Sequence, residues 1–250
     1  LSINDLSSDG NQPITHPYFY EYTLICNGEI YNWKELAVKY DVELKSKSDC
    51  EIIIHLYEKI GIEKLVKELD GVFSFIIFDG KKDKVYMARD PIGVRPMFFR
   101  INNDNSVSIA SEMKSIYKIK LEGFNNAPIQ QFKPGHWSSL DDLKSNKFNQ
   151  YYILPNIINY EFNQDVILKN IRDKLTKAVL KRVTTSDRPI GCLLSGGLDS
   201  SLITALVAQY FPKGKLKTFS VGLEGSVDLK YAKLVAEHLG TDHIEVILSE

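Results

Sequence analysis

The sequence has few cysteines, no long apolar run and almost no net charge, and each shortage argues against a class of protein. Its three cysteines, Cys26, Cys50 and Cys192, form no C-x-x-C pair. Neither a disulfide framework nor a thiolate zinc site is therefore indicated, and a reducing cytosol fits best. The longest strongly apolar stretch, Val72 to Phe78, is far shorter than the roughly 20 residues of a membrane helix. A net charge of -1 argues against general attraction to nucleic acid or anionic membrane.

The rest of the composition is that of an ordinary globular protein. Hydrophobic residues make up 44% and charged residues 25% of the chain, which indicates neither disorder nor a fibrous repeat. At the usual ~100–200 residues per domain the length indicates one large or two modest domains, and we start from two. The sequence opens on Leu1 rather than Met and stops at Glu250 directly after a strand-like run. We therefore expect both ends to lie inside a longer protein.

The first part of the chain mixes strand-like and helical patterns. An apolar helical period runs from Cys50 to Tyr57. The dipeptide Asp79-Gly80 separates two strand-like runs and predicts a hairpin, and a polar loop separates two further runs. Several hairpins with a few helices indicate a layered α+β domain. The expected strands are Tyr22–Cys26, Val72–Phe78, Lys84–Ala88, Met97–Ile101 and Val107–Ala110.

The second part changes to alternating strands and helices. An amphipathic helix is expected from about Ile167 to Val179, and the alternation that begins at Arg188 is typical of a parallel α/β sheet. From Asp141 to Gln164 the composition is rich in Asn, Lys and Ser without a clean period, as in an interdomain connection. We predict a first domain over residues 1–150, a connection over 151–165 and the start of a second domain over 166–250.

The most informative segment is a short apolar strand, Ile190–Leu194, that runs into the turn Ser195–Ser201 and then into an apolar helix. Glycines let a backbone approach a ligand closely, and unpaired N–H groups at a helix start favour an anion. The turn lacks the lysine of a Walker A motif, so we expect it to cradle pyrophosphate rather than to support γ-phosphoryl transfer. The alternative is an ordinary glycine turn in which Asp199 or Ser200 caps the helix.

The turn resembles the S-G-G-x-D-S loop of the ATP-pyrophosphatase group. That resemblance implies an enzyme that cleaves ATP between its α and β phosphates to adenylate a carboxylate, with Asp199 as the candidate ligand of Mg²⁺. It also implies that Val221, in an expected strand over Lys217–Gly222, packs on adenine. Without the resemblance, a buried strand residue is the simpler interpretation of that valine. The residues implied at the ATP site are Leu194, Ser195, Gly196, Gly197, Leu198, Asp199, Ser200, Ser201 and Val221.

A second resemblance covers the first domain. The run Asn27-Gly28-Glu29-Ile30-Tyr31-Asn32 ends the first expected strand, and a side-chain amide beside a glycine N–H is a sensible oxyanion hole for an amide substrate. After it come S-D-C-E at 48–51, D-G-V-F at 70–73, R-D-P-I-G-V-R-P at 89–96 and A-S-E-M-K at 110–114. These segments resemble, in the same order, class II glutamine amidotransferases, which implies the αββα fold of N-terminal-nucleophile enzymes.

The resemblance also implies roles for single residues. In that family the nucleophile is an N-terminal cysteine whose own α-amine is the base, and no such cysteine is visible in this sequence. Asn27 and Gly28 are implied to hold the tetrahedral oxyanion, and Glu29 and Asp49 to bind the ammonium group of glutamine. The first three residues resemble the segment just after the arginine that grips the substrate α-carboxylate. The implied substrate-binding residues are thus Leu1, Ser2, Ile3, Glu29 and Asp49.

Other polar residues have structural interpretations. Ser48 and Glu51 form an S-x-x-E capping box, so Asp49 has a competing role in favouring a helix dipole, although we favour substrate binding. The charged residues of segment 89–96 are left out of the site, because structural ion pairs explain them at least as well. Cys26, Cys50 and Cys192 are not expected to be nucleophiles. Five histidines without metal-ligand spacing are taken as structural or surface residues, namely His16, His55, His136, His238 and His243.

The order of the two resemblances, which together cover nearly the whole chain, is similar to that of the asparagine synthetase B family. It implies hydrolysis of glutamine to glutamate and ammonia, formation of β-aspartyl-AMP and pyrophosphate from aspartate and ATP, and displacement of AMP by ammonia. Glutamine, aspartate and ATP are the implied partners, Mg²⁺ the implied ion, the cytoplasm the implied location and a homodimer the implied candidate assembly. Two alternatives are kept: a β-lactam-synthetase-like enzyme with an inactive glutaminase domain, and a non-catalytic nucleotide-binding scaffold.

Overall fold

The computed structural model describes residues 4–117, 127–155 and 163–249. It divides into two compact units, Leu1–Ile157 and Ile158–Glu250, and each is described here by itself. The predicted connection over 151–165 contains this point of division. The polar stretch that begins at Asp141 nevertheless starts within the first unit, because helix α4 (Leu140–Lys144) and strand β9 (Asn149–Gln150) are formed there.

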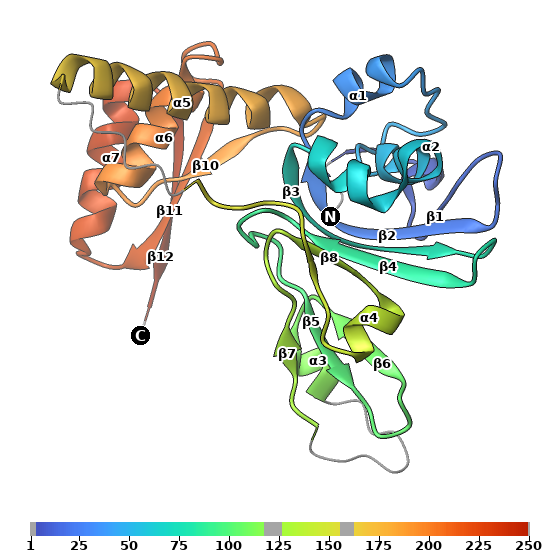
Figure 1. Ribbon diagram of the computed structural model, residues 1–250. Helices are drawn as coiled ribbons and strands as arrows, with labels where there is room; N and C mark the ends of the chain where they lie inside the picture. The colour runs from blue at the N-terminus through green and yellow to red at the C-terminus, as the bar shows by residue number, and fades with distance from the viewer. Residues whose placement is uncertain (1–3, 118–126, 156–162, 250) are drawn as a thin grey trace. The chain divides into compact units, whose positions relative to one another are not determined.

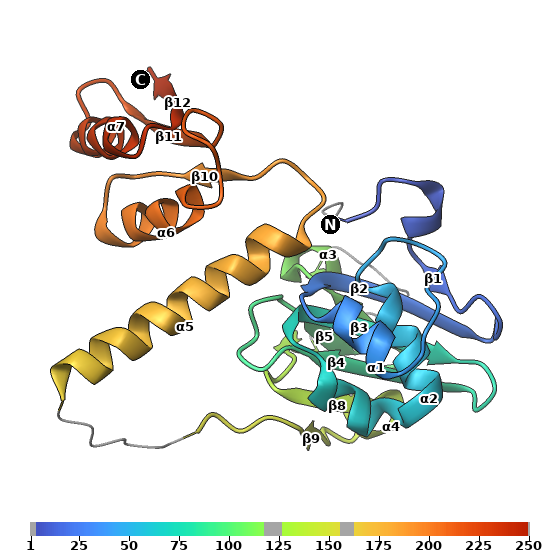
Figure 2. The same cartoon turned by 90° about the horizontal axis from the view of Figure 1, so that it is seen from above.

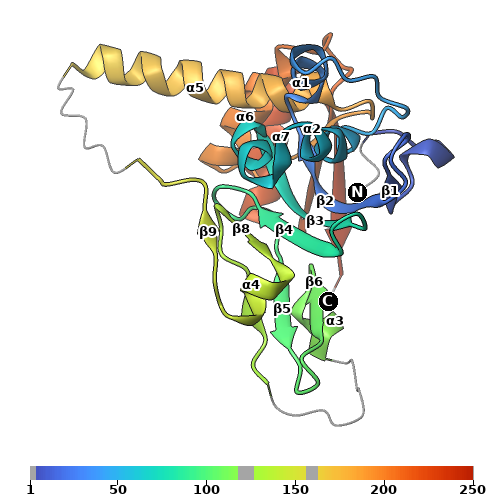
Figure 3. The same ribbon diagram turned by 45° about the vertical axis from the view of Figure 1, so that its right-hand side comes forward.

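The first unit has four layers (Figures 1 and 3). Helices α1 (Trp33–Lys39) and α2 (Glu51–Glu68) cover one face of a six-stranded antiparallel sheet with the order β1-β2-β3-β4-β8-β9. A three-stranded antiparallel sheet, β6-β5-β7, lies against the other face, and α3 (Met113–Tyr117) packs on β5 and β6. The predicted αββα class is therefore confirmed. The strands are β1 (Ile14–Thr15), β2 (Tyr22–Ile30), β3 (Gly71–Asp79), β4 (Lys84–Arg89), β5 (Phe98–Ile101), β6 (Val107–Ala110), β7 (Gln130–Gln131) and β8 (His136–Ser139).

Alternation along the central strands fills two separate cores. Every second residue of β2 and β3, such as Leu24 and Phe75, is buried against α2, whose Ile52 to Leu56 are almost fully enclosed. The intervening residues of β3 and β4 face the second sheet, where Met87 packs in a cluster with Phe99 and Phe132. Side chains of a strand alternate between its two faces, and both faces of β3 are covered, so each face contributes to one core. This accounts for the nearly continuous apolar run of β3.

All five predicted strands of this unit are formed, and Asp79 and Gly80 stand at the predicted hairpin between β3 and β4. Strand β2 is longer than predicted. It continues to Ile30 and pairs with β3 through Ile30 and Gly71. Helix α2 is interrupted at Gly61, whose φ of 72° is outside the helical range.

Arg89 of β4 ties the first unit together. Its Nε donates to the carbonyl of Arg95 at 2.7 Å, its Nη1 to that of Phe132 at 2.8 Å and its Nη2 to that of Gly93 at 2.7 Å. The side chain is buried, with 2% exposed. Because Phe132 directly follows β7, this guanidinium connects the two sheets through charge-assisted hydrogen bonds.

The second unit is a parallel α/β arrangement, as predicted. Strands β10, β11 and β12 pair in that order and in parallel, α6 lies beside β10, and α7 packs on β11 and β12 (Figure 2). Gly240 ends α7 as its C-cap with a φ of 66°. None of the described helices combines the length and apolar character needed to cross a membrane. The elements are α5 (Gln164–Thr185), β10 (Gly191–Leu193), α6 (Leu198–Ala208), β11 (Lys217–Leu223), α7 (Val227–Leu239) and β12 (Asp242–Leu248).

The contacts of Arg89 predict the result of a conservative substitution. Arg89→Lys keeps the positive charge but cannot reach three carbonyls at once, so we expect the first unit to lose about 2–4 kcal/mol of its free energy of unfolding. Urea unfolding followed by tryptophan fluorescence measures this loss. Lys84→Ala removes only an exposed ion pair with Asp141 and should leave the unfolding midpoint nearly unchanged. Equal midpoints for Arg89→Lys and the original protein would contradict the assigned role.

Candidate active site

Strand β2 determines where three of the predicted site residues lie. Successive side chains of a strand point to opposite faces, so Asn27 and Glu29 face the second sheet while Gly28 lies on the helix side. Successive backbone N–H groups likewise alternate, but between the two edges of the strand. The N–H of Cys26 donates to Gln12 Oε1 at 2.6 Å and that of Ile30 to Asp49 Oδ2 at 2.6 Å, both on the β1 side of the strand. The N–H of Gly28 therefore points to that same edge, between these two contacts.

The lack of a side chain at Gly28 has a packing reason of its own. A Cβ atom at this position would lie 2.4 Å from the carbonyl oxygen of Val72 and 2.7 Å from the Cα of Phe73. Real Cβ contacts are not this short, so any other residue would push β2 away from β3. The glycine is required by the sheet, whatever else its N–H does.

The Asn27 side chain opens into a cavity between the two sheets. Its Nδ2 donates to Ser111 Oγ at 3.2 Å, a contact between residues that are 84 positions apart. The cavity has a volume of about 230 Å³ and combines polar and apolar walls. Gln12, Ser74 and Ser111 provide further polar groups, and Met97 and Ile109 provide apolar ones. A pocket with a few convergent polar groups is the usual form of a small-molecule site.

Glu29 already has a cationic partner. Its Oε1 lies 2.9 Å from Arg95 Nη2, and the two side chains are 18% and 23% exposed. Arg95 is held in turn by its backbone N–H, which donates to Asp90 Oδ2 at 2.9 Å. The charged residues of segment 89–96 thus bind protein groups, in agreement with the structural interpretation. Glu29 can accept a substrate ammonium only as a second partner beside Arg95.

Asp49 lies at the β2 edge and is 5% exposed. Burial raises the pKa of its carboxyl group, and hydrogen bonds from the Ile30 N–H and the Asn4 side chain oppose that rise. The capping box expected from Ser48 and Glu51 is not formed. The Glu51 carboxylate instead accepts hydrogen bonds from the N–H groups of Lys45 at 2.8 Å and of Ser46 at 2.7 Å, and Cys50, at the helix start, makes no side-chain cap bond. The prediction of a capping box formed by Ser48 and Glu51 was therefore wrong.

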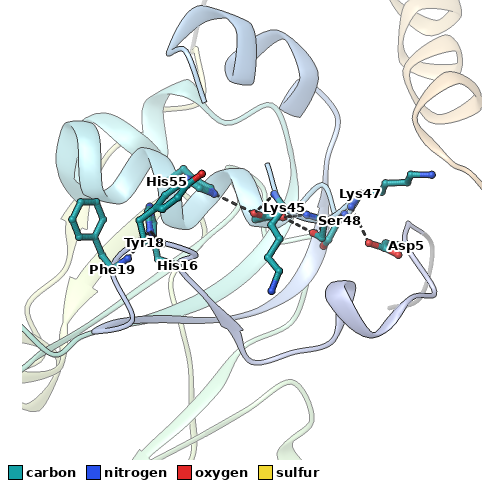
Figure 4. Close-up of polar contacts among 10 residues, drawn as sticks. Asp5, His16, Tyr18, Phe19, Lys45, Lys47, Ser48 and His55 are labelled. Carbon is teal, nitrogen blue, oxygen red and sulfur yellow. Dashed lines mark hydrogen bonds and ion pairs between the residues drawn. The ribbon is translucent and has the colours of Figure 1, made fainter. Parts of the chain in front are cut away.

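Glu51, His55 and His16 form a buried polar cluster, and both histidines are labelled in Figure 4. The Oε1 of Glu51 lies 3.2 Å from His55 Nε2, and the rings of His55 and His16 are 4.4 Å apart. His16 Nδ1 accepts hydrogen bonds from the N–H groups of Tyr18 and Phe19 at 3.2 and 3.1 Å, so this nitrogen carries no proton. Burial, assisted by His55, lowers the pKa of His16 to about 4.

The two cysteines of this unit are poor nucleophiles. Cys50 Sγ lies 3.8 Å from the carbonyl oxygen of Gly28, to which it donates. A hydrogen bond with Cys26, together with burial, raises the pKa of the Cys50 thiol well above its usual value. Both residues are free thiols inside the core, where a thiolate is not stabilised.

In the second unit, the Ser195–Ser201 turn connects β10 to α6. Gly196 has a φ of +77°, and a Cβ there would lie 2.5 Å from the backbone nitrogen of Ala232, so the turn lies directly against the backbone in the middle of α7. Gly197 is the N-cap of α6. The hydroxyl groups of Ser195 and Ser200 bond each other at 3.0 Å. These two hydroxyl groups must rotate before they can bind any other ligand.

The structure brings only part of the predicted ATP-site set together. A cavity of about 560 Å³ at the carboxyl ends of the three strands is lined by Leu194, Ser195, Ser200 and Val221. Val221 is 62% exposed, so the interpretation as a buried strand residue was wrong. The other five residues of the set do not line this cavity. Gly196, Gly197, Leu198 and Ser201 form the turn and first helical residues around it, and Asp199 lines a neighbouring cavity with Ser200.

Residues 1–3 and the metal ligands are the last parts of the predicted site. Leu1, Ser2 and Ile3, expected near the substrate carboxylate, lie outside the described residues. Across 4–117, 127–155 and 163–249, no three His, Cys, Asp or Glu side chains gather as a protein-only metal site needs. A divalent ion bound at Asp199 therefore needs ligands from elsewhere, such as phosphate oxygens.

Comparison with known proteins settles the family of the first unit. Residues 1–139 match the family model of the glutamine amidotransferase domain. The chain belongs to this glutamine amidotransferase family. Residues 170–250 match the model described as asparagine synthase.

Curated relatives align with nearly the whole chain. The chain is 38% identical over 262 aligned residues to the glutamine-hydrolysing asparagine synthetase of Homo sapiens and 39% identical to that of Bos taurus. Each alignment covers 96% of this chain and 46% of the relative. The chain thus spans about half the length of the curated relatives it matches. A solved glutamine phosphoribosylpyrophosphate amidotransferase from B. subtilis is 16% identical with a TM-score of 0.48, and the match covers 97% of this chain and 65% of the other.

Three residues at the candidate site in the first unit were not predicted from sequence. Gln12 holds the backbone of Cys26, Ser111 contacts Asn27, and Arg95 pairs with Glu29. Ser111 and Arg95 do stand within segments that carried the resemblance. Nothing local in the sequence marks Gln12, because its role depends on the folding of β1 beside β2.

The neutral state of His16 predicts how stability depends on pH. The folded protein holds its pKa near 4, against 6.5 for an unperturbed histidine, so between these values the unfolded chain binds more protons. The contribution of neutral His16 to the free energy of unfolding is fully present above about pH 6.5 and is lost as pH falls toward 4. His16→Asn keeps an acceptor near the Nδ1 position but cannot titrate. We expect a flatter dependence of unfolding free energy on pH for this variant, measured by urea unfolding at pH 4.5 to 7.5.

His238→Asn, an exposed substitution in the second unit, serves as the control and should retain the original pH profile. Parallel profiles for His16→Asn and the original protein would contradict the assignment of this slope to His16.

Proposed function

We propose that the chain is part of a glutamine-hydrolysing asparagine synthetase. In the proposed reaction the first unit hydrolyses glutamine to glutamate and ammonia. The second unit activates aspartate with ATP as β-aspartyl-AMP, releasing pyrophosphate, and ammonia then displaces AMP to give asparagine. The proposal rests on the turn at Ser195–Ser201 opening into a strand-end cavity with Val221, in a chain that belongs to the glutamine amidotransferase family.

For the glutaminase half, we assign roles from the geometry of β2. Asn27 Nδ2 and the Gly28 N–H are the proposed donors to the oxyanion, since the strand directs the Gly28 N–H and Ser111 already holds the Asn27 amide. Asp49 and Glu29 are the proposed partners of the substrate ammonium. Leu1, Ser2 and Ile3 remain proposed contacts of the substrate carboxylate. The proposed nucleophile is a cysteine that is not among the 250 residues.

For the synthetase half, the turn has the properties of a pyrophosphate cradle. Serine hydroxyls and the first N–H groups of α6 offer donors to an anion. Gly196 lets the turn lie close to the backbone of Ala232, where a Cβ would not fit. The proposed ATP contacts are Leu194 to Ser201 and Val221. Mg²⁺, when bound, neutralises phosphate charge, and Asp199 is its proposed protein ligand. Asp199 is exposed at the first turn of α6, so its carboxylate can bind an ion without being buried uncompensated.

The remaining assignments follow from this function. We propose residues 1–150 as the glutaminase domain, 151–165 as the connection and 166–250 as the start of the synthetase domain. Glutamine, aspartate and ATP are the proposed substrates, and a cytoplasmic location and a homodimer are proposed with them. The three free cysteines suit a reducing compartment.

Pyrophosphate release tests the synthetase half. In the full-length protein that contains this chain, ATP, Mg²⁺ and aspartate should give one pyrophosphate for each AMP. Asp199→Asn should lower the rate on the order of 100-fold, because the loss of the carboxylate leaves phosphate charge less well neutralised. Asp165→Asn, at the first turn of α5, is the matched control and should keep the rate. Absence of aspartate-dependent pyrophosphate release would favour a nucleotide-binding scaffold instead.

A substitution at Asp49 tests the glutaminase half. Asp49→Asn keeps an oxygen for the Ile30 N–H but removes the negative charge, so the KM for glutamine should rise at least about tenfold. Ammonia-dependent asparagine synthesis should stay nearly unchanged. Asp79→Asn, which alters a buried carboxylate of β3 that accepts a hydrogen bond from Tyr57 of α2, should lower stability without this selective loss. Equal loss of both activities in Asp49→Asn would point to folding. Pyrophosphate release from ATP in the original protein without use of either glutamine or ammonia would favour the β-lactam-synthetase-like alternative, which closes an internal amide.

A further inference from the structure

We propose that Ser111 and Gln12 are positioning residues that fix the Asn27 carboxamide for glutamine hydrolysis. The inference deepens the proposed function and rests on it. Both residues line the cavity into which Asn27 opens. Ser111 contacts the side chain of Asn27, and Gln12 contacts the backbone of Cys26 just before it.

A side-chain amide needs such positioning to stabilise an oxyanion. The terminal torsion of asparagine is broad and nearly two-fold, so the amide nitrogen and oxygen can exchange places at little cost. Only the nitrogen end donates, and the oxygen end would repel a developing negative charge. Stabilisation of the oxyanion depends on donors that are already aimed before the reaction.

Ser111 supplies a partner for one N–H of the amide. It directly follows β6, and its Oγ accepts from Asn27 Nδ2 at 3.2 Å. The NH₂ group has two hydrogens. When one is bound to Ser111, the second points elsewhere in the cavity with a fixed direction. A contact between the two sheets thus engages one N–H of the Asn27 amide and leaves its second N–H for the oxyanion.

Gln12 fixes the backbone immediately before Asn27. Its Nε2 donates to the carbonyl of Cys26 at 2.8 Å, and its Oε1 accepts from the N–H of Cys26 at 2.6 Å. One side-chain amide therefore replaces a strand partner. Strand β1 pairs with β2 only at Thr23 and Leu24, so the Gln12 amide extends the ladder to the residue next to Asn27. A carboxylate cannot copy this, because it has no donor for the carbonyl.

A purely structural role makes a different prediction. If the Asn27–Ser111 contact only tied the sheets together, its loss would lower stability and leave the turnover of folded enzyme unchanged. A positioning role lowers kcat for glutamine with little change in KM, because the orientation matters mainly in the transition state.

The test uses Ser111→Ala in the full-length protein. Glutaminase kcat should fall about tenfold, the KM for glutamine should change less than about twofold, and ammonia-dependent synthesis should keep its rate. Ser108→Ala is a closely matched control: Ser108, on β6, accepts from Asn102 Nδ2 at the same 3.2 Å. It removes an equivalent asparagine–serine bond away from Asn27 and should leave kcat unchanged.

Two further substitutions keep the test valid if Ser111→Ala folds poorly. Ser111→Thr and Ser111→Val have nearly the same shape, and only threonine retains the hydroxyl group. Threonine should keep most of the original kcat, while valine should match alanine. Gln12→Glu should also lower kcat for glutamine without affecting ammonia use, since its carboxylate faces the carbonyl of Cys26.

The outcomes separate this inference from the function on which it rests. A Ser111→Ala kcat within about twofold of the original, or equal kcat values for Ser111→Thr and Ser111→Val, would overturn the positioning role alone. Absence of glutamine hydrolysis in the original full-length protein would overturn the proposed function and this inference with it.

Discussion

The close approach of β2 and β3 at two glycines is the constraint on which the amidotransferase site depends. A Cβ at Gly28 would lie 2.4 Å from the carbonyl of Val72, and a Cβ at Gly71 would lie 2.2 Å from that of Glu29. Only glycine permits this spacing at both positions. The nine-residue ladder between the strands then fixes the direction of every side chain and N–H from Asn27 to Ile30, and with them the proposed oxyanion donors.

Polar contacts beyond the ladder hold the same edge in place. Gln12 and Asp49 occupy the N–H groups on either side of Gly28, and Arg95 pairs with Glu29. These groups are partly or fully buried, and a buried polar group without a partner is costly. Arg89 performs a similar task at the second sheet by binding three carbonyls. The site is thus rigid because its supporting groups satisfy one another.

Local patterns were sufficient to predict much of this architecture. Strands β3 and β4 and the Asp79-Gly80 hairpin between them are each determined within a few residues, and all were predicted. The exposure of Val221 and the partners of Glu51 were not, because they depend on which segments the fold brings together. The same is true of the contact between Asn27 and Ser111, which are 84 positions apart. Of the proposed site, sequence could indicate the residues on β2 but not the groups that orient them.

A structure of the full-length protein after reaction with a diazo-ketone analogue of glutamine, which forms a covalent adduct with the nucleophile, tests the central claim most directly. The account predicts that the ketone oxygen of the adduct lies about 2.7–3.1 Å from both Asn27 Nδ2 and the Gly28 nitrogen, with Asn27 still bonded to Ser111. An adduct whose oxygen is directed away from the edge of β2, toward other donors, would contradict it.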